Sequence, residues 1–192
     1  MLNHIGTREI ATERLLLRRF RMDDAEAMFR GWASDGEVTR YLTWQPHGDA
    51  EVTKKLTASW VEQYARKDCY RWCIVWKENG EPIGCIDVVR LVEELETGVI
   101  GYCMAKEYWG RGVMTEALAA VMEYLFVNVG LYRIQAYHQT QNPASGKVMK
   151  KCGMQFEGVL RQSAKTNAGE YCDVAYYSIL RPEWRRQHPS VP

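Results

Sequence analysis

A short glycine segment near the middle of the chain has the residue types of an anion-binding loop. Gly110, Arg111 and Gly112 stand between an apolar, strand-like run over 98–105 and a strongly helical pattern that starts at about Val113. Glycine lets the backbone bend tightly and approach a ligand closely. The first amides of a helix are unpaired and carry a partial positive charge, which suits a phosphate group. The segment predicts either a phosphate-binding loop or a strand-to-helix turn in which the glycines serve geometry alone.

The two best-known phosphate loops do not match this segment. The Walker pattern needs Lys and then Ser or Thr after its last glycine, and Val113 and Met114 stand there. The dinucleotide-binding pattern needs a third glycine, and Thr115 takes its place. A different kind of loop is therefore indicated.

A second polar segment opens a predicted helix that ends before Gly153. It contains Asn142 and Ser145, separated by Pro143 and Ala144. In a purely structural interpretation, Asn142 caps the helix and Ser145 is a first-turn residue. In a functional interpretation, the amide and the hydroxyl face a ligand.

Both segments resemble motifs of the Gcn5-related N-acetyltransferase (GNAT) superfamily. Its acetyl-CoA loop reads Gln or Arg, two variable residues, Gly, one variable residue, then Gly or Ala. On this chain the pattern covers 109–114 with Gly112 at its central glycine, and it departs from the pattern at Trp109 and Met114. Residues 110–117 are similar to the RimJ and RimL branch of ribosomal-protein N-terminal acetyltransferases. The resemblance extends from about Thr12 to Trp184.

The resemblance implies a binding path for acetyl-CoA. Its diphosphate would lie on the backbone amides of Gly110, Arg111, Gly112, Val113, Met114 and Thr115. Its pantetheine arm would pair, like an added strand, with exposed backbone groups of Tyr102, Cys103 and Met104.

The second segment would act on the other parts of the co-substrate. Asn142 would contact the pantetheine arm, and Lys147 or Lys150 would lie near the nucleotide. Ser145 would protonate or hydrogen-bond the departing thiolate. Many relatives have a Tyr for that role at the position of Met149, so Ser145 is the better candidate here.

The general base is not identified by the resemblance. Attack by an amine needs a base, or a water chain to one, because most free amines are protonated at neutral pH. Where relatives carry a Glu, this chain has Val99 and Ala164. The remaining candidates are Asp87, Glu96, His138 and Glu170.

Composition predicts one ordinary globular domain over residues 1–192, with a core of about 12–184. A net charge of +1 favours neither nucleic acid nor a membrane surface, and no apolar run is long enough to span a bilayer. The six cysteines lack metal-site spacing, so no metal is expected and free thiols are predicted. With no signal peptide apparent, we expect a cytoplasmic protein.

The elements that must position these residues form a predicted α/β fold. We expect a twisted mixed sheet of six or seven strands, split near its centre, with helices on both faces. Strands are expected at 12–19, 70–76, 82–91, 98–105, 131–137, 154–161 and 171–180, and helices at 23–33, 49–66, 113–129 and 142–152. The segment 34–48 reads as an aromatic-rich loop or broken helix. The tail from Arg181, with its prolines, is expected to be loosely ordered.

These features predict an enzyme that transfers an acetyl group from acetyl-CoA to a primary amine. The acceptor is either a protein N-terminal amine or a small-molecule amine. The sequence is also compatible with a homodimer. The alternative is a non-catalytic module that binds or senses acyl-CoA, because no base stands out in the sequence.

Overall fold

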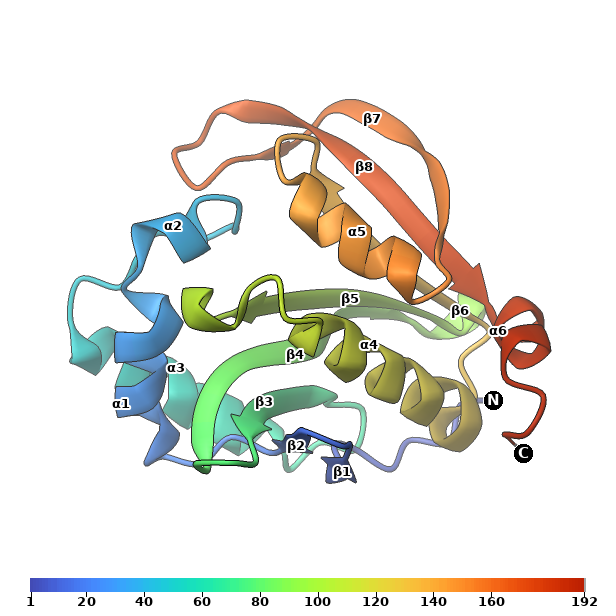
Figure 1. Ribbon diagram of the computed structural model, residues 1–192, viewed down its shortest axis with the longest axis horizontal. Coiled ribbons are helices and arrows are strands. Elements are labelled where there is room, and N and C mark those ends of the chain that lie inside the picture. Colours follow the sequence, from blue (N-terminus) through green and yellow to red (C-terminus); the bar gives the residue numbers. More distant parts are fainter. Residues whose placement is uncertain (192) are drawn as a thin grey trace.

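The computed structural model describes residues 1–191, and one mixed sheet organises this part of the chain (Figure 1). Its eight strands lie in the order β1-β2-β3-β4-β5-β6-β8-β7. They are β1 (Ile10–Ala11), β2 (Leu15–Arg18), β3 (Arg71–Trp76), β4 (Glu81–Val92), β5 (Thr97–Met104), β6 (Arg133–Gln139), β7 (Gln155–Lys165) and β8 (Tyr171–Leu180). The prediction of six or seven strands was too low because β1 has only two residues, too few to produce a pattern.

Helices cover both faces of the sheet, as predicted. They are α1 (Asp24–Met28), α2 (Gly36–Thr39), α3 (Ala50–Gln63), α4 (Val113–Tyr124), α5 (Pro143–Lys151) and α6 (Arg181–Gln187). A π-helical turn extends α1 to Ala33, and another extends α4 to Val129. Helices α4 and α5 lie on one face, and α1 and α3 pack on the other face at the β2–β4 side (Figure 1).

The two faces have separate apolar cores because side chains alternate along each strand. On β3, Trp72 and Ile74 join the core under α4, while Cys73 and Val75 join the core under α1 and α3. The apolar pattern of 113–129 correctly predicted a buried helix there, and Gly130 ends it with φ of 87°.

The predicted split of the sheet lies between β5 and β6. These two strands are parallel and pair only from Thr97 to Ile100 on β5 and from Arg133 to Ala136 on β6. Beyond this point β6 continues along β8, while β5 continues along β4. Residues 101–104 therefore form the open arm of a fork.

Helix α3 packs Leu56 and Trp60 of its apolar face against the core, and Tyr64 just after it is buried. Val52 at its start is 44% exposed, however, and Thr53 and Thr57 are fully buried. The Thr57 hydroxyl donates to the carbonyl of Thr53, so its burial leaves no polar atom unsatisfied. A threonine counts as polar in a hydropathy pattern, so the pattern does not predict the burial of Thr53 and Thr57.

The Asp23–Asp24 pair at the start of α1 offers a carboxylate for the helix N-cap, but the structure uses it differently. The Asp23 side chain makes no capping hydrogen bond. Asp24 is instead buried and accepts two hydrogen bonds from the Arg18 guanidinium, both of 2.7 Å, and one from the amide of Arg21. The carboxylate therefore ties β2 to α1.

The chain after β8 forms a helix over Arg181–Gln187, contrary to the predicted loose order, and Pro192 of the predicted tail lies outside the described residues. Helix α6 starts with Pro182 in its first turn, and the Glu183 carboxylate accepts from the amide of Leu180. Trp184 is 2% exposed and packs on Phe126, with 5.4 Å between ring centroids. A single buried tryptophan thus fixes a segment whose prolines suggested disorder.

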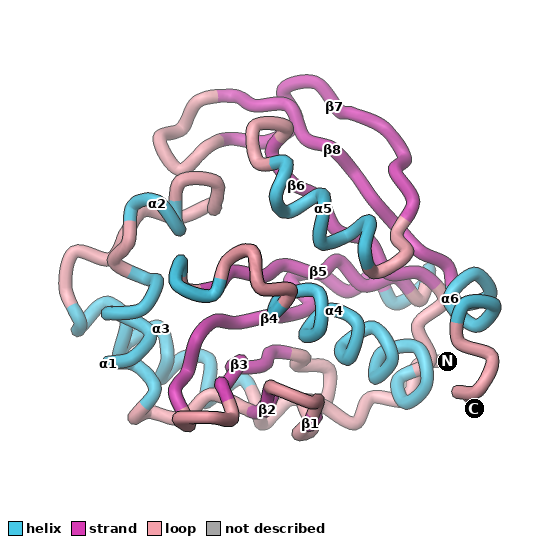
Figure 2. Tube along the Cα trace, in the orientation of Figure 1, coloured by secondary structure: helices cyan, strands magenta, loops and turns pink. Residues whose placement is uncertain are grey.

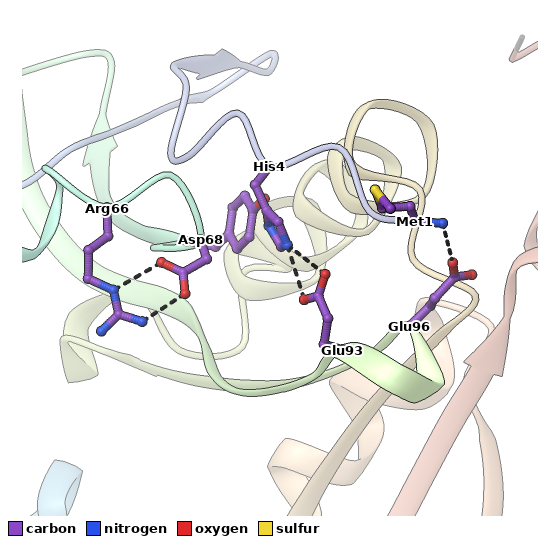
Figure 3. Close-up of polar contacts among 7 residues, drawn as sticks. Met1, His4, Arg66, Asp68, Glu93 and Glu96 are labelled. Atoms are coloured by element: carbon purple, nitrogen blue, oxygen red, sulfur yellow. Dashed lines mark hydrogen bonds and ion pairs between the residues drawn. The ribbon is translucent and has the colours of Figure 1, made fainter.

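The segment ahead of the sheet is held by polar contacts (Figure 3). The amino group of Met1 pairs with Glu96 at 3.1 Å, and His4 contacts both Tyr70 and Glu93. These contacts join the first residues of the chain to the turn before β5.

Within residues 1–191, no helix combines the length and hydropathy needed to cross a membrane. The same part of the chain holds no cluster of three or more His, Cys, Asp or Glu side chains that could bind a metal ion. All six cysteines are free thiols, and the Sγ atoms of Cys85 and Cys103 lie 3.4 Å apart across β4 and β5.

Candidate active site

A cleft of about 580 Å³ opens at the fork between β5 and β6. Its walls are the end of β5, the loop before α4, the first turns of α5 and the segment around α2. The structure brings together around this cleft almost all the predicted site residues: Tyr102, Cys103, Met104, Gly110, Gly112, Val113, Met114, Thr115, Asn142, Ser145 and Lys147. Arg111 is the exception, because its guanidinium lies over the Tyr108 ring, 5.6 Å from the centroid.

The glycine loop has the backbone conformation that its sequence predicts. Gly110 and Gly112 both have φ of 74°, a left-handed conformation that other residues adopt at a cost. Gly112 is the N-cap of α4, and no side chain described in residues 1–191 caps this helix end. The amides of its first turn line the cleft, so the loop fits a diphosphate group.

An ion pair from the N-terminal part of the chain supports this loop from behind. The Glu116 carboxylate accepts from the Thr12 hydroxyl at 2.6 Å and from the amide and Nε of Arg14 at 2.9 and 2.7 Å. Nη1 of Arg14 also donates to the carbonyl of Arg111 at 3.0 Å. The sequence analysis did not identify Thr12, Arg14 or Glu116 as site residues, because their contact spans about half of the chain.

The open arm of β5 presents part of the backbone that a pantetheine group would need. Tyr102, Cys103 and Met104 line the cleft, where β6 no longer pairs with them. The carbonyl of Met104, however, accepts a 2.9 Å hydrogen bond from the indole of Trp109. This carbonyl already accepts a hydrogen bond within the protein. The predicted pantetheine contact at Met104 would therefore need another backbone group of that residue.

The start of α5 has the capping geometry of the structural interpretation. The Asn142 side chain accepts from the amide of Ser145 at 3.4 Å, and Pro143 occupies the first turn. Both Asn142 and Ser145 still border the cleft, so capping does not remove them from the site. Lys147 borders it as well, whereas Lys150 lies over the ring of Tyr177 at 5.9 Å.

The Ser145 hydroxyl meets a tyrosine that the sequence analysis treated only as a backbone contact. The Tyr102 hydroxyl lies 2.9 Å from Oγ of Ser145 and 3.0 Å from the Ser145 carbonyl oxygen. Burial raises the pKa of Tyr102 well above its usual value, although the hydrogen bond with Ser145 lowers it in part. The phenol is therefore neutral throughout the physiological range.

The four predicted base candidates lie outside the cleft lining. Asp87 is paired with Arg71 at 3.0 Å, and burial raises its pKa despite that partner. Glu96 pairs with the amino group of Met1, as Figure 3 shows, and Glu170 is exposed beside the turn between β7 and β8. His138 has Nδ1 at 2.7 Å from the carbonyl of Gln139 and packs against α5.

Glu37 is the carboxylate that does line the cleft, among the residues that the structure describes. It lies on α2 and forms an ion pair with Lys106, which follows β5. Helix α2 begins at the N-cap Asp35, whose carboxylate accepts from the amide of Glu37 at 2.7 Å. The Asp35 cap is the sequence signal for this short helix, which lies in the segment 34–48 that reads as an aromatic-rich loop or broken helix.

The loop between α2 and α3 lies near the turn between β7 and β8 (Figure 2), and its residues Tyr41 and Leu42 line the cleft. The Asn167 side chain, from the turn after β7, donates to the carbonyl of Thr39 at 3.0 Å. Gln45 donates back to the carbonyl of Asn167, and Gln139 donates to the carbonyl of Tyr41 at 3.4 Å. These contacts join α2 to the β7–β8 side of the fork.

Comparisons with known proteins agree with this architecture. The family model described as an acetyltransferase (GNAT) domain matches residues 14–155. The uncharacterized N-acetyltransferase YoaA of Bacillus subtilis is 36% identical over 173 residues, covering 90% of this chain and 97% of YoaA.

Two further comparisons concern proteins with named substrates. The ribosomal-protein-serine acetyltransferase of Escherichia coli is 26% identical over 139 residues, covering 72% of this chain and 76% of that enzyme. A structure of RimL, a ribosomal L7/L12 alpha-N-protein acetyltransferase in complex with coenzyme A, matches with a TM-score of 0.81 at 21% identity. It covers 90% of this chain and 98% of RimL. The family match over most of the chain, together with the identity to YoaA, shows that this protein belongs to the GNAT acetyltransferase family.

Proposed function

We propose that this protein transfers an acetyl group from acetyl-CoA to a primary amine. The observation that carries the proposal is the convergence of three features on one cleft: the start of α4, the end of β5 where β6 no longer pairs with it, and the hydroxyl of Ser145. Each feature suits a different part of an acyl-CoA molecule, and they lie in the order that such a ligand needs.

The chain's residues divide the binding of acetyl-CoA between them. The amides of Gly112, Val113 and Met114 hold the diphosphate at the start of α4. The backbone of Tyr102 and Cys103 pairs with the amides of the pantetheine arm, as a neighbouring strand would. Lys147 supplies positive charge near the nucleotide end.

The transfer forms a C–N bond, breaks the C–S bond and moves one proton from the amine to the leaving thiolate. Ser145 donates a hydrogen bond to the developing thiolate, which makes that sulfur a better leaving group. The amine proton leaves through water, because the cleft lining offers no carboxylate without a partner among the described residues.

Glu37 is proposed to attract the protonated amine to the cleft, where the amine gives one proton to water before it attacks the thioester. A carboxylate on the acceptor side raises the local concentration of a cationic substrate. The acceptor is a primary amine, and the ribosomal-protein-serine acetyltransferase among the relatives favours a protein as its carrier. Small-molecule amines are the second class to test.

Calorimetric titration with acetyl-CoA, followed by thiol release with a panel of amines and N-terminal peptides, tests the proposal. We expect binding, and release that depends on the acceptor. Binding without release from any acceptor would favour an acyl-CoA sensor. Absence of binding would overturn the assignment of the loop at 110–115.

A further inference from the structure

We propose that Tyr102 is a positioning residue that directs the hydroxyl proton of Ser145 toward the leaving thiolate. This inference rests on the proposed acetyl transfer and deepens it. Its basis is the double contact of one phenol with one serine: 2.9 Å to Oγ and 3.0 Å to the carbonyl oxygen of the same residue.

The contact can be satisfied by two arrangements of the hydrogen atoms. A carbonyl oxygen only accepts, while each hydroxyl has one proton to donate. When Tyr102 donates to the carbonyl, the proton of Ser145 must turn toward the phenol oxygen to complete the 2.9 Å contact. When Tyr102 donates to Oγ instead, the serine proton is free to point into the cleft.

A thiolate in the cleft selects the second arrangement. Negative charge on sulfur attracts the proton of Ser145, and the phenol proton then rotates from the carbonyl oxygen to Oγ. Both hydroxyls turn, and no proton leaves Tyr102. The chain of two donors strengthens the bond to the charged sulfur, because each hydrogen bond polarises the next.

The surroundings of Tyr102 keep it suited to this role. Its ring packs against the core under α4, which holds the hydroxyl beside α5. Because burial raises its pKa, the phenol remains a neutral donor rather than a phenolate. It lies on the part of β5 that has parted from β6, so the strand proposed to hold the pantetheine arm also carries the phenol.

The first test measures the pKa of the thiol of bound coenzyme A, which requires no turnover. Ultraviolet absorbance of the thiolate is followed against pH, with coenzyme A that lacks its sulfur as the reference ligand. We expect the bound thiol to titrate at lower pH in the unaltered protein than in Tyr102→Phe or Ser145→Ala. Equal titration in all three proteins would overturn the inference.

The second test is a double-mutant cycle on kcat, with saturating acetyl-CoA. Removing the serine donor should lower kcat by about a hundredfold, and removing the phenol hydroxyl by about tenfold. Because Tyr102 acts through Ser145, Tyr102→Phe should cause no further loss in the Ser145→Ala background. An undiminished tenfold loss in that background would instead show that the phenol only supports the fork.

A matched control separates this role from packing. Tyr177→Phe removes the hydroxyl of another tyrosine, whose side chain is 5% exposed, and no hydrogen bond to that hydroxyl is found among residues 1–191. We expect it to leave kcat, acetyl-CoA affinity and the thiol pKa unchanged. Tyr102→Phe should keep the acetyl-CoA affinity as well, and a loss of that affinity would contradict the inference. Failure of the unaltered protein to bind acetyl-CoA would refute the proposed function itself, which is a different outcome.

Discussion

Arg14 and Glu116 form an ion pair, 2.7 Å between Nε and Oε2, that lies directly behind the glycine loop. The same guanidinium donates to the carbonyl of Arg111 within the loop, and the same carboxylate accepts from the Thr12 hydroxyl. The pair is partly buried, since Glu116 is 18% exposed and Arg14 is 36% exposed. It therefore connects the edge of the sheet, the loop and the first turn of α4.

Breaking this pair should weaken acetyl-CoA binding. In Glu116→Gln the neutral side chain loses the charged partner of Arg14, so the loop amides are less well oriented. We expect about tenfold weaker binding by calorimetry, which corresponds to the loss of a hydrogen bond to a charged group. Arg66→Ala is the matched control, because it breaks the exposed pair with Asp68 (Figure 3) and neither of these residues lines the cleft. If both variants lose affinity equally, the pair does not act through the loop.

The same carboxylate predicts a pH dependence of stability. Burial tends to raise the pKa of Glu116, but the hydrogen bonds from Thr12 and Arg14 outweigh it and leave the pKa below the ordinary value of 4.5. The ionised group therefore stabilises the fold above that value, and the contribution is lost as pH falls through the lower pKa of the folded state.

Urea unfolding between about pH 6 and about pH 3 measures this contribution. The unaltered protein should lose more free energy of unfolding over this range than Glu116→Gln does. Parallel curves for the two proteins would contradict the prediction.

Glu37 should affect the acceptor and not the acetyl-CoA. Replacing it by Gln removes the negative charge on α2 and leaves the shape of the cleft similar. We expect the KM for amine acceptors to rise by about fivefold, because attraction at a solvent-exposed site is modest. Steady-state kinetics with one peptide and one small amine check this.

Glu94→Gln serves as the control for Glu37, because it removes a charge from the turn before β5, outside the cleft lining. The acetyl-CoA dissociation constant should stay the same in both variants. A weaker acetyl-CoA affinity in Glu37→Gln would show that this carboxylate contributes to acetyl-CoA binding. That result would contradict its proposed role toward the acceptor.

Gly146 should be intolerant of a side chain. A Cβ at this position would lie 2.5 Å from Nε2 of His138, so β6 and α5 could not keep their separation. Alanine is otherwise the better helix former. We expect Gly146→Ala to lower the free energy of unfolding by about 1–3 kcal/mol, as overpacked sites do. Urea unfolding of the double variant with His138→Ala should recover most of that loss if the contact with the ring is the cause.

Local sequence was sufficient for the regular elements and for the loop. The wide apolar pattern of 113–129 predicted α4, and its two ends coincide with Gly112 and Gly130, which adopt left-handed conformations. A helix and its glycine ends depend on residues only a few positions apart, so residue composition and spacing are enough to predict them. The order of the two motifs was also enough to indicate the family.

The tail and the buried face of α3 depended on tertiary packing. Trp184 packs on Phe126, and the hydroxyl of buried Thr57 lies 4.0 Å from the Met28 sulfur of α1. Neither partner can be predicted from hydropathy, since a tryptophan among prolines and a threonine on a helix both resemble surface residues. For this reason the prediction for the tail was wrong, and the burial of the α3 threonines was not predicted.

The polar geometry of the site was decided by the fold alone. Tyr102 and Ser145 are 43 positions apart, and Arg14 and Glu116 are 102 positions apart. Their contacts exist because β5 and β6 stop pairing after Ile100 and Ala136, which lets α5 approach β5, and because β2 lies beneath α4. The sequence by itself determined which residues could bind a phosphate or donate a proton. Strand register and helix packing determined which of them meet, since distances between remote residues are set only when the sheet is assembled.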